Sequence, residues 1–248
     1  CMDVYDRTGE AYPGGNPVNV AVYTVRLGGA ASYTGVVGTD AYGDLMRTSL
    51  AGKGVDVSHL RRQAGATAVS HVELVNGDRV FGDYEEGVMA DFRMTQADLD
   101  FLAGHDLVVT GLWSHTAPDL PKLKARGAPV AFDFADKQTD PALDLALPYV
   151  DYAFFSHDGT EEEVRDFLRA AQKKGPKLAV ATRGERGSLA FDGEHFYEYG
   201  IVPCAVVDTM GAGDSFIAGF LFALLRGASI PECMAQGAAC SSVTLQYS

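Results

Sequence analysis

A glycine-rich loop near the end of the chain combines a carboxylate with backbone amides. The segment Asp208–Asp214 (DTMGAGD) follows a short apolar run, 205–207, and precedes a longer one, 215–226. These flanks predict a strand, a loop and a buried helix, a junction that presents free N–H groups at the positive end of the helix. Such junctions bind phosphate, and the small residues 211–213 would let a phosphoryl group approach the backbone closely.

Asp214 has a chemical use at such a site. A carboxylate beside a bound anion is electrostatically unfavourable unless it has a task, and accepting a proton from an attacking hydroxyl is one. Phosphoryl transfer has a loose transition state, so an ordinary carboxylate suffices as the base. The alternative is that Asp214 only caps the helix. The loop is neither a Walker A sequence nor a dinucleotide fingerprint, because Gly52-Lys53 precedes Gly54 and Phe216 occupies the third glycine position.

Two further glycine-containing segments carry groups that suit small ligands. In 14–19 (GGNPVN), Pro17 suits the first turn of a helix and Asn16 its cap, and the backbone and amides could bind sugar hydroxyls. The segment 182–187 (TRGERG) follows a buried strand and could hold nucleotide phosphates, with charge added by Arg183. The alternatives are a well-capped helix and a surface turn before a hairpin.

The elements that must position these segments alternate between strand and helix. Short runs rich in Val, Ala and Phe predict strands buried on both faces, at 106–111, 129–133, 151–156 and 177–182. Polar–apolar segments such as 160–174, with Thr160 as N-cap, predict intervening helices. This alternation predicts a parallel sheet covered by helices.

Two regions depart from that alternation. Residues 67–74 and 79–84 flank Asn76-Gly77, and residues 188–191 and 195–199 flank Asp192-Gly193. Both pairs predict β-hairpins, because the central residues accept positive φ. The first hairpin is long, and we expect it to project from the main body as a lid.

Composition excludes several classes of protein. The 248 residues include 20 basic and 33 acidic side chains, a net charge of −13 that disfavours nucleic acid and anionic membranes as partners. The longest apolar stretch, 216–225, is about half of what a bilayer requires, and no secretory signal is visible. The 4 cysteines form no Cys-x-x-Cys pair, which argues against a zinc site and predicts a reduced, cytoplasmic protein.

The three motifs in this order resemble the ribokinase-like (PfkB) carbohydrate kinase family over nearly the whole chain. The resemblance implies one kinase domain over residues 1–248, an α/β three-layer sandwich with a mostly parallel central sheet and a small β lid from about 65–92. It implies ATP-dependent phosphorylation of a primary sugar hydroxyl with ATP and Mg²⁺. Within the family, the segment 78–92 favours fructoselysine as the substrate. A kinase for another sugar or a nucleoside, and a non-catalytic sugar-binding module, are the alternatives.

Residue roles follow from the resemblance position by position. Asp214 matches the catalytic base, and the anion hole is matched by Gly211, Ala212 and Gly213. The sugar side is matched by Asp3, Gly15 and Asn19, with Gly14 and Asn16 beside them. The nucleotide side is matched by Thr182, Gly184 and Gly187, with Arg183 beside them and Thr209 near the phosphates. Asp208 stands where many relatives bind a monovalent cation such as K⁺.

The lid sequence offers charges for an amine-bearing sugar. Asp83, Glu85 and Glu86 could neutralise the amine of fructoselysine, and Arg79 could meet its carboxylate. A solvated strand of mixed charge is the alternative. Trp113 and His115 could pack on the sugar, but a core position is favoured for the tryptophan. Lid strands in this family often pair between subunits, which predicts a homodimer.

The sequence departs from the family pattern in two places. Almost all of the strand that usually leads to the position of Asp3 is missing, and we interpret the sequence as incomplete at its start. The segment 156–159 (SHDG) stands where relatives often have Asn-x-x-Glu. Asp133, Asp136 and Lys137 follow a strand end and could help with metal or phosphate, or form a solvated loop.

Overall fold

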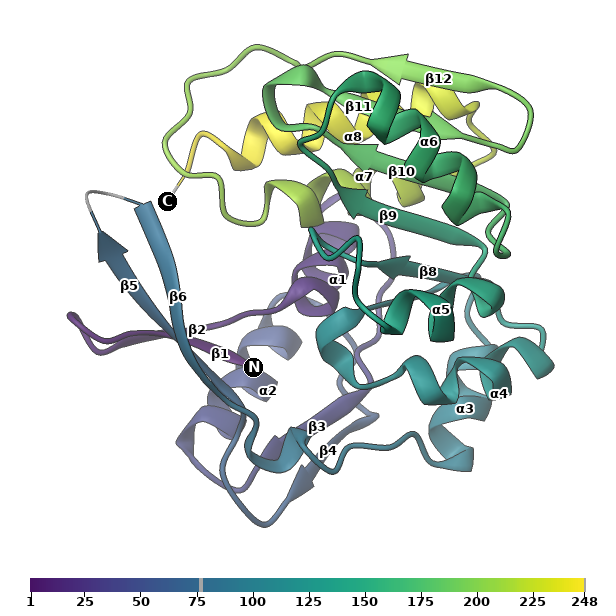
Figure 1. Cartoon of the computed structure of the whole chain (residues 1–248). Coiled ribbons are helices and arrows are strands. Elements are labelled where there is room, and N and C mark those ends of the chain that lie inside the picture. The colour runs from purple at the N-terminus through teal and green to yellow at the C-terminus, as the bar shows by residue number, and fades with distance from the viewer. Residues whose placement is uncertain (76–77, 248) are drawn as a thin grey trace. The chain divides into compact units, whose positions relative to one another are not determined.

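The chain divides into two compact units, Cys1–Arg93 and Met94–Ser248, called unit 1 and unit 2 below (Figure 1). The computed structural model describes residues 1–75 and 78–247, with the backbone alone for 73–75 and 78–81. Each unit is described by itself.

Unit 1 combines short strands with two longer helices. Its elements are β1 (Met2–Tyr5), β2 (Glu10–Pro13), α1 (Asn16–Arg26), β3 (Gly35–Gly38), α2 (Ala41–Gly52), β4 (Leu60–Gln63), β5 (Val69–Val75), β6 (Asp78–Glu85) and a 3-10 turn, Gly87–Met89. The described strands form a four-stranded sheet in the order β2-β1-β5-β6 and a parallel pair, β3-β4.

The predicted first hairpin is confirmed in its strands. β5 and β6 pair antiparallel, as far as Val75 opposite Asp78. The predicted Asn76-Gly77 turn and the side chain of Arg79 lie outside the described residues. The sheet is larger than the expected 65–92 segment, because β1 pairs parallel with β5 and antiparallel with β2. The lid role of this sheet stays a prediction.

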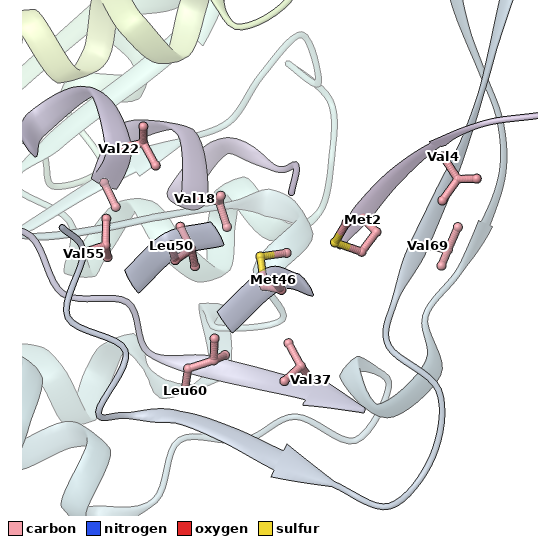
Figure 2. Packing of buried hydrophobic residues seen from close by; sticks show 11 residues of the cluster. Met2, Val4, Val18, Val22, Val37, Met46, Leu50, Val55, Leu60 and Val69 are labelled. Carbon is pink, nitrogen blue, oxygen red and sulfur yellow. The ribbon is translucent and has the colours of Figure 1, made fainter. Parts of the chain in front are cut away.

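The core of unit 1 is a cluster of aliphatic side chains from both helices and both sheets (Figure 2). Val18 and Val22 lie one turn apart on α1, and Met46 and Leu50 lie one turn apart on α2. Met2 of β1 is completely buried in the same cluster. Burying side chains of this kind stabilises by about 1.5–3 kcal/mol each, so this cluster holds the short β1 strand in place.

A partly buried hydrogen-bond network joins the end of β3 to the start of α2 and to the segment before β5. Thr67 Oγ1 donates to Asp40 Oδ1 at 2.5 Å, and Thr67 N donates to Asp40 Oδ2 at 2.7 Å. Gly38 N donates to Thr67 Oγ1 at 2.9 Å. Partial burial opposes ionisation of Asp40, but the hydrogen bonds from Thr67 and Gly43 prevail and lower its pKa.

Thr67→Ala is expected to lower the free energy of unfolding by about 1–3 kcal/mol. The substitution leaves the buried N–H of Gly38 without its acceptor and removes a donor from Asp40. Urea unfolding followed by circular dichroism measures the loss. Thr67→Ser keeps the hydroxyl and is the matched control. Equal losses in the two variants would assign the effect to the missing methyl group and contradict the role of the network.

Unit 2 contains the predicted alternation of strands and helices. Its strands are β7 (Val108–Gly111), β8 (Val130–Asp133), β9 (Tyr152–Ser156), β10 (Leu178–Thr182), β11 (Ser188–Phe191) and β12 (Phe196–Tyr199). Its helices are α3 (Gln96–Ala103), α4 (Leu120–Ala125), α5 (Ala142–Ala146), α6 (Glu161–Gln172), α7 (Ala212–Leu225) and α8 (Ile230–Thr244). Short 3-10 turns lie at Leu112–Ser114, Ala117–Asp119, Leu147–Tyr149 and Gly184–Arg186.

The described strands of unit 2 form one six-stranded sheet in the order β12-β11-β10-β9-β8-β7. Neighbours from β7 to β10 are parallel, and β11 and β12 form the predicted second hairpin. Successive side chains of a strand point to opposite faces. Phe154 of β9 contacts Phe220 of α7, whereas Phe155 contacts Phe167 of α6. The two helices therefore cover opposite faces, which confirms the α/β sandwich with a mostly parallel sheet.

Local signals explain where α6 begins. Thr160 Oγ1 and the Glu163 carboxylate form a reciprocal capping box, so the predicted N-cap is confirmed. The second hairpin has a longer loop than predicted, because Asp192 Oδ1 accepts hydrogen bonds from the backbone N–H groups of Glu194 and His195. Among the helices of residues 1–75 and 78–247, none is long and apolar enough to cross a membrane.

Candidate active site

The loop Asp208–Asp214 leads directly into α7, which begins before the predicted residue Ser215. The helix begins at Ala212, and the preceding Gly211 has φ 73° and ψ 1°, the left-handed conformation that favours glycine. Asp214 is therefore the third residue of the helix, and its interpretation as an N-cap is wrong. The predicted start is too late because the glycine-rich sequence around Ala212 and Gly213 is typical of a loop, whereas both residues are helical.

The first turn of α7 is accessible to a ligand. Its first N–H groups have no acceptor within the helix, and that of Ala212 donates to the carbonyl of Thr209 in the loop at 3.3 Å. Gly213 is exposed and Asp214 is half-buried. A Cβ added at Gly213 would meet no atom within 4 Å, so the space beside it is open. Asp208 Oδ1 accepts a hydrogen bond from Met210 N at 2.9 Å and shapes the loop. The arrangement suits an anion at these amides, with the carboxylate close by.

The end of α8 holds this loop in place. Ser241 Oγ donates to the carbonyl of Ala212 at 2.7 Å, at the start of α7. Val207 N donates to the carbonyl of Leu245 at 2.7 Å. The prediction of a strand at 205–207 is wrong, because these residues form no strand in the structure. Contacts with the last helix, which the local sequence does not reveal, position the loop instead.

Asp133 faces the same region from the sheet. It is the last residue of β8, and its Oδ1 accepts a hydrogen bond from Ala135 N at 2.9 Å. The pKa of Asp133 is raised to about 7, chiefly by burial. The hydrogen bond from Ala135 opposes this rise, and the negative charges of Asp214 and Asp136 add to it. From the sequence, Asp133 could either help to bind metal or phosphate or lie in a solvated loop. Its burial and its electrostatic interaction with Asp214 favour a position beside the candidate site.

The turn after β8 is strained and well supported. Ala135 has φ 50°, a left-handed conformation that is unfavourable for a residue with a side chain. Its N–H donates to Asp133, and its carbonyl accepts from Ser156 N of β9 at 2.8 Å. By contrast, Asp136 and Lys137 form an exposed ion pair at 3.0 Å. Strained residues are frequent at functional sites, where the surrounding structure maintains them.

The segment 182–187 forms a tight turn at the carboxyl end of β10. Gly184 and Gly187 both have positive φ, 57° and 76°. A Cβ added at Gly187 would lie 2.1 Å from the carbonyl oxygen of Tyr199, so only glycine fits there. Thr182 Oγ1 donates to the carbonyl of Phe155 at 3.4 Å, which ties the end of β10 to β9.

Arg183 supports this turn from inside the protein. The residue is buried, and its Nη2 donates to Glu198 Oε1 at 2.6 Å and to the carbonyl of Arg186 at 3.0 Å. The sequence offered Arg183 as added charge for nucleotide phosphates. The structure pairs that charge with the carboxylate of Glu198 in β12, which holds the turn, and the role of Arg183 toward nucleotide phosphates stays a prediction. Arg183 is buried while Glu185, two residues later, is exposed, and the local sequence does not predict this difference.

The groups predicted for a sugar gather at one end of α1 in unit 1. A Cβ added at Gly14 would lie 2.0 Å from Asp3 Oδ2, so the carboxylate of Asp3 rests against this glycine. The prediction that Asn16 caps α1 is wrong: Gly15, with φ 98°, is the N-cap and Asn16 is the first helical residue. Asn19 follows three residues later, and spacing by three places both asparagines on neighbouring positions of the helix surface.

The four-stranded sheet of unit 1, β2-β1-β5-β6, is called the lid sheet after its predicted role, and acidic residues lie in β6 and directly after it. Asp83 and Glu86 are exposed. Glu85 Oε1 lies 3.6 Å from His71 Nε2, and the other ring nitrogen lies 2.7 Å from Asp6 Oδ1. The hydrogen bond with Asp6 raises the pKa of His71. All three side chains are exposed, and Glu85 also contacts His71 of β5, so the binding of an amine by Asp83 stays a prediction.

The described residues contain no group of three His, Cys, Asp or Glu side chains that could hold a metal ion. Asp208, predicted for a monovalent cation, makes the turn with Met210 already described. Magnesium is commonly bound through one or two carboxylates together with substrate phosphates. The residues present therefore fit a metal that arrives with a triphosphate rather than one held in a preformed protein cage.

Comparison with known proteins identifies similar chains of full length. The family model described as pfkB family carbohydrate kinase matches residues 2–248. Fructoselysine 6-kinase of Escherichia coli is 44% identical over 247 residues, which cover 100% of this chain and 95% of that one. A fructosamine kinase of Bacillus subtilis is 37% identical, covering 98% and 87%. Ribokinase of Arabidopsis thaliana, solved with ribose and ATP, has a TM-score of 0.90 and 26% identity, covering 99% and 90%.

Proposed function

The chain belongs to the pfkB family of carbohydrate kinases, and from this premise we propose that it phosphorylates fructoselysine with ATP. The γ-phosphoryl group of ATP is transferred to the primary hydroxyl at carbon 6, which gives fructoselysine 6-phosphate and ADP. The full-length similarity to fructoselysine 6-kinase and to a fructosamine kinase supports this substrate class over ribose or adenosine.

The observation that carries the proposal is the first turn of α7. The loop amides at Gly211–Gly213 stabilise the charge on the phosphoryl group during transfer, and Asp214 accepts the proton that the acceptor hydroxyl releases. The oxygen of that hydroxyl forms the new bond to phosphorus, while the bond from phosphorus to the β-phosphate oxygen breaks. Because the transition state is loose, the proton leaves late and a carboxylate of ordinary basicity is adequate.

Binding roles are assigned to groups within each unit. Asp3, Gly14, Gly15, Asn16 and Asn19 of unit 1 suit the hydroxyls of the sugar. On the nucleotide side, the turn at Thr182, Gly184 and Gly187 and the hydroxyl of Thr209 suit ATP. Mg²⁺ bound to ATP neutralises phosphate charge, and K⁺ near Asp208 is the proposed monovalent cation. Asp83 of the lid sheet suits the amine of the substrate.

The proposed setting is a cytoplasmic homodimer that acts on a small molecule. β2 and β6 are the edges of the described four-stranded sheet. Unpaired strand edges favour pairing with another chain unless they are covered, and a second copy of the lid sheet would cover one of them. Sedimentation of the purified protein should give a dimer mass. A monomer at assay concentration would contradict this part of the proposal.

A substrate panel tests the proposed reaction. Release of ADP is measured with fructoselysine, fructose and adenosine as acceptors in the presence of ATP and Mg²⁺. We expect the highest kcat/KM for fructoselysine. A higher value for fructose or adenosine would show that the acceptor is another sugar or a nucleoside. Sugar binding without turnover of any acceptor would instead indicate a non-catalytic sugar-binding module.

A further inference from the structure

Trp113 is the single tryptophan of the chain, and it is 62% exposed. The core position that the sequence favours for it is therefore wrong. A large aromatic side chain normally gains free energy by burying its faces. An indole held in solvent has its faces available to a ligand, so its surroundings merit a functional explanation.

The loop that carries Trp113 is fixed at both ends. It begins where β7 ends, at Gly111, and closes where Thr110 Oγ1 and Thr116 Oγ1 share a hydrogen bond of 2.8 Å. Both threonines are buried. Between them, His115 has φ 54° and ψ 19°, a left-handed conformation that is unfavourable for a residue with a side chain. The backbone maintains a strained turn that leaves the indole exposed.

Trp113 lies at the same edge of the sheet as the proposed base. In the parallel ladder of β7 and β8, Gly111 is paired with Asp133, and Trp113 follows Gly111 by two residues. Asp133 in turn interacts with the charge of Asp214. All of these residues belong to unit 2. Ligands of open parallel sheets bind at the carboxyl ends of the strands, where this loop begins.

We propose that the indole face of Trp113 contacts the secondary ammonium group that joins sugar and amino acid in the acceptor. This inference rests on the proposed function and names a residue that determines its specificity. The face of an aromatic ring attracts a cation, and tryptophan does so most strongly. Fructose has no cation at this position, so the contact favours ketoses that carry an amine over plain ketoses.

Kinetics of two substitutions test the contact. Trp113→Leu keeps apolar bulk but removes the aromatic face, and we expect kcat/KM for fructoselysine to fall about 3- to 30-fold. Trp113→Phe keeps a weaker aromatic face and should show a smaller loss. With fructose as acceptor, both variants should match the wild-type protein. Equal losses for fructoselysine and fructose would overturn the proposal, because the residue would then serve the fold or the sugar ring.

Fluorescence gives a second readout that does not depend on turnover. With one tryptophan in the chain, the emission of the wild-type protein reports on Trp113 alone. Fructoselysine should protect it from acrylamide quenching without ATP, and fructose should not. Protection by ATP alone, or none by fructoselysine, would overturn the contact even where fructoselysine is phosphorylated. Absence of wild-type turnover with fructoselysine would instead overturn the proposed function and this inference with it.

Discussion

Asp214→Asn is expected to lower kcat by about 10²–10⁴-fold while ATP binding is retained. The amide has nearly the shape of the carboxylate but cannot accept the proton of the acceptor hydroxyl. Asp214 is the third residue of α7, so the substitution leaves the left-handed Gly211 and the amides of the loop in place. KM for the sugar should change little, because the base acts in the transition state rather than in binding. Phosphorylation of fructoselysine gives kcat, and calorimetric titration gives the affinity for ATP.

Asp136→Asn is the matched control for this experiment. Asp136 also follows β8 at the carboxyl edge of the sheet, but it is exposed and paired with Lys137 at 3.0 Å. The control removes the same charge without touching the proposed base and should keep the wild-type kcat. Loss of ATP binding together with turnover in Asp214→Asn would mean that the loop had collapsed and would contradict the assignment.

The elements of unit 2 could be predicted because their signals are local. The strands β7 to β10 read as short apolar runs, and α6 has both its capping residue and the acid that completes the capping box. β1 escaped prediction because its parallel partner, β5, lies far along the chain. β2 escaped it because none of its four residues is buried, so it has no apolar run. Pairing with β5 and the buried position of Met2 place β1 in the sheet. Those contacts depend on the whole fold of unit 1.

The sequence predicted which residue types form the candidate site. It predicted less well which of them are buried and which side chains they contact. The loop before α7 could be predicted from Gly211 and Asp214. Its left-handed position requires glycine, and a carboxylate beside an anion-binding loop indicates a chemical role. Burial is decided by contacts far apart in sequence. Arg183 is therefore enclosed against Glu198, whereas Trp113 is exposed, and the sequence favours the opposite environment for each.

Asp133→Asn is expected to remove a large pH dependence from the stability of the protein. The pKa of Asp133 is about 7 in the folded protein, raised from the ordinary value of 3.8 chiefly by burial. Between these values the folded protein holds a proton that the unfolded chain releases. The free energy of unfolding therefore falls as the pH rises through this interval, by at most about 1.4 kcal/mol per pH unit. Asparagine stays neutral, so urea unfolding of the variant at several pH values should lack this slope.

The cause of the raised pKa distinguishes this effect from general acid or base denaturation. Burial is the leading cause and the charge of Asp136 a lesser one, so Asp136→Asn should keep most of the slope. The same slope in Asp133→Asn as in the wild-type protein would show that this carboxyl group ionises like a surface acid, and its assignment to the site would be wrong. Loss of the slope in Asp133→Asn would show that ionisation of the Asp133 carboxyl group, at the end of β8, destabilises the folded protein. When Asp133 is protonated, the carboxyl edge of the sheet carries one negative charge fewer near Asp214. This lowers the electrostatic repulsion of the triphosphate that the proposed reaction requires there.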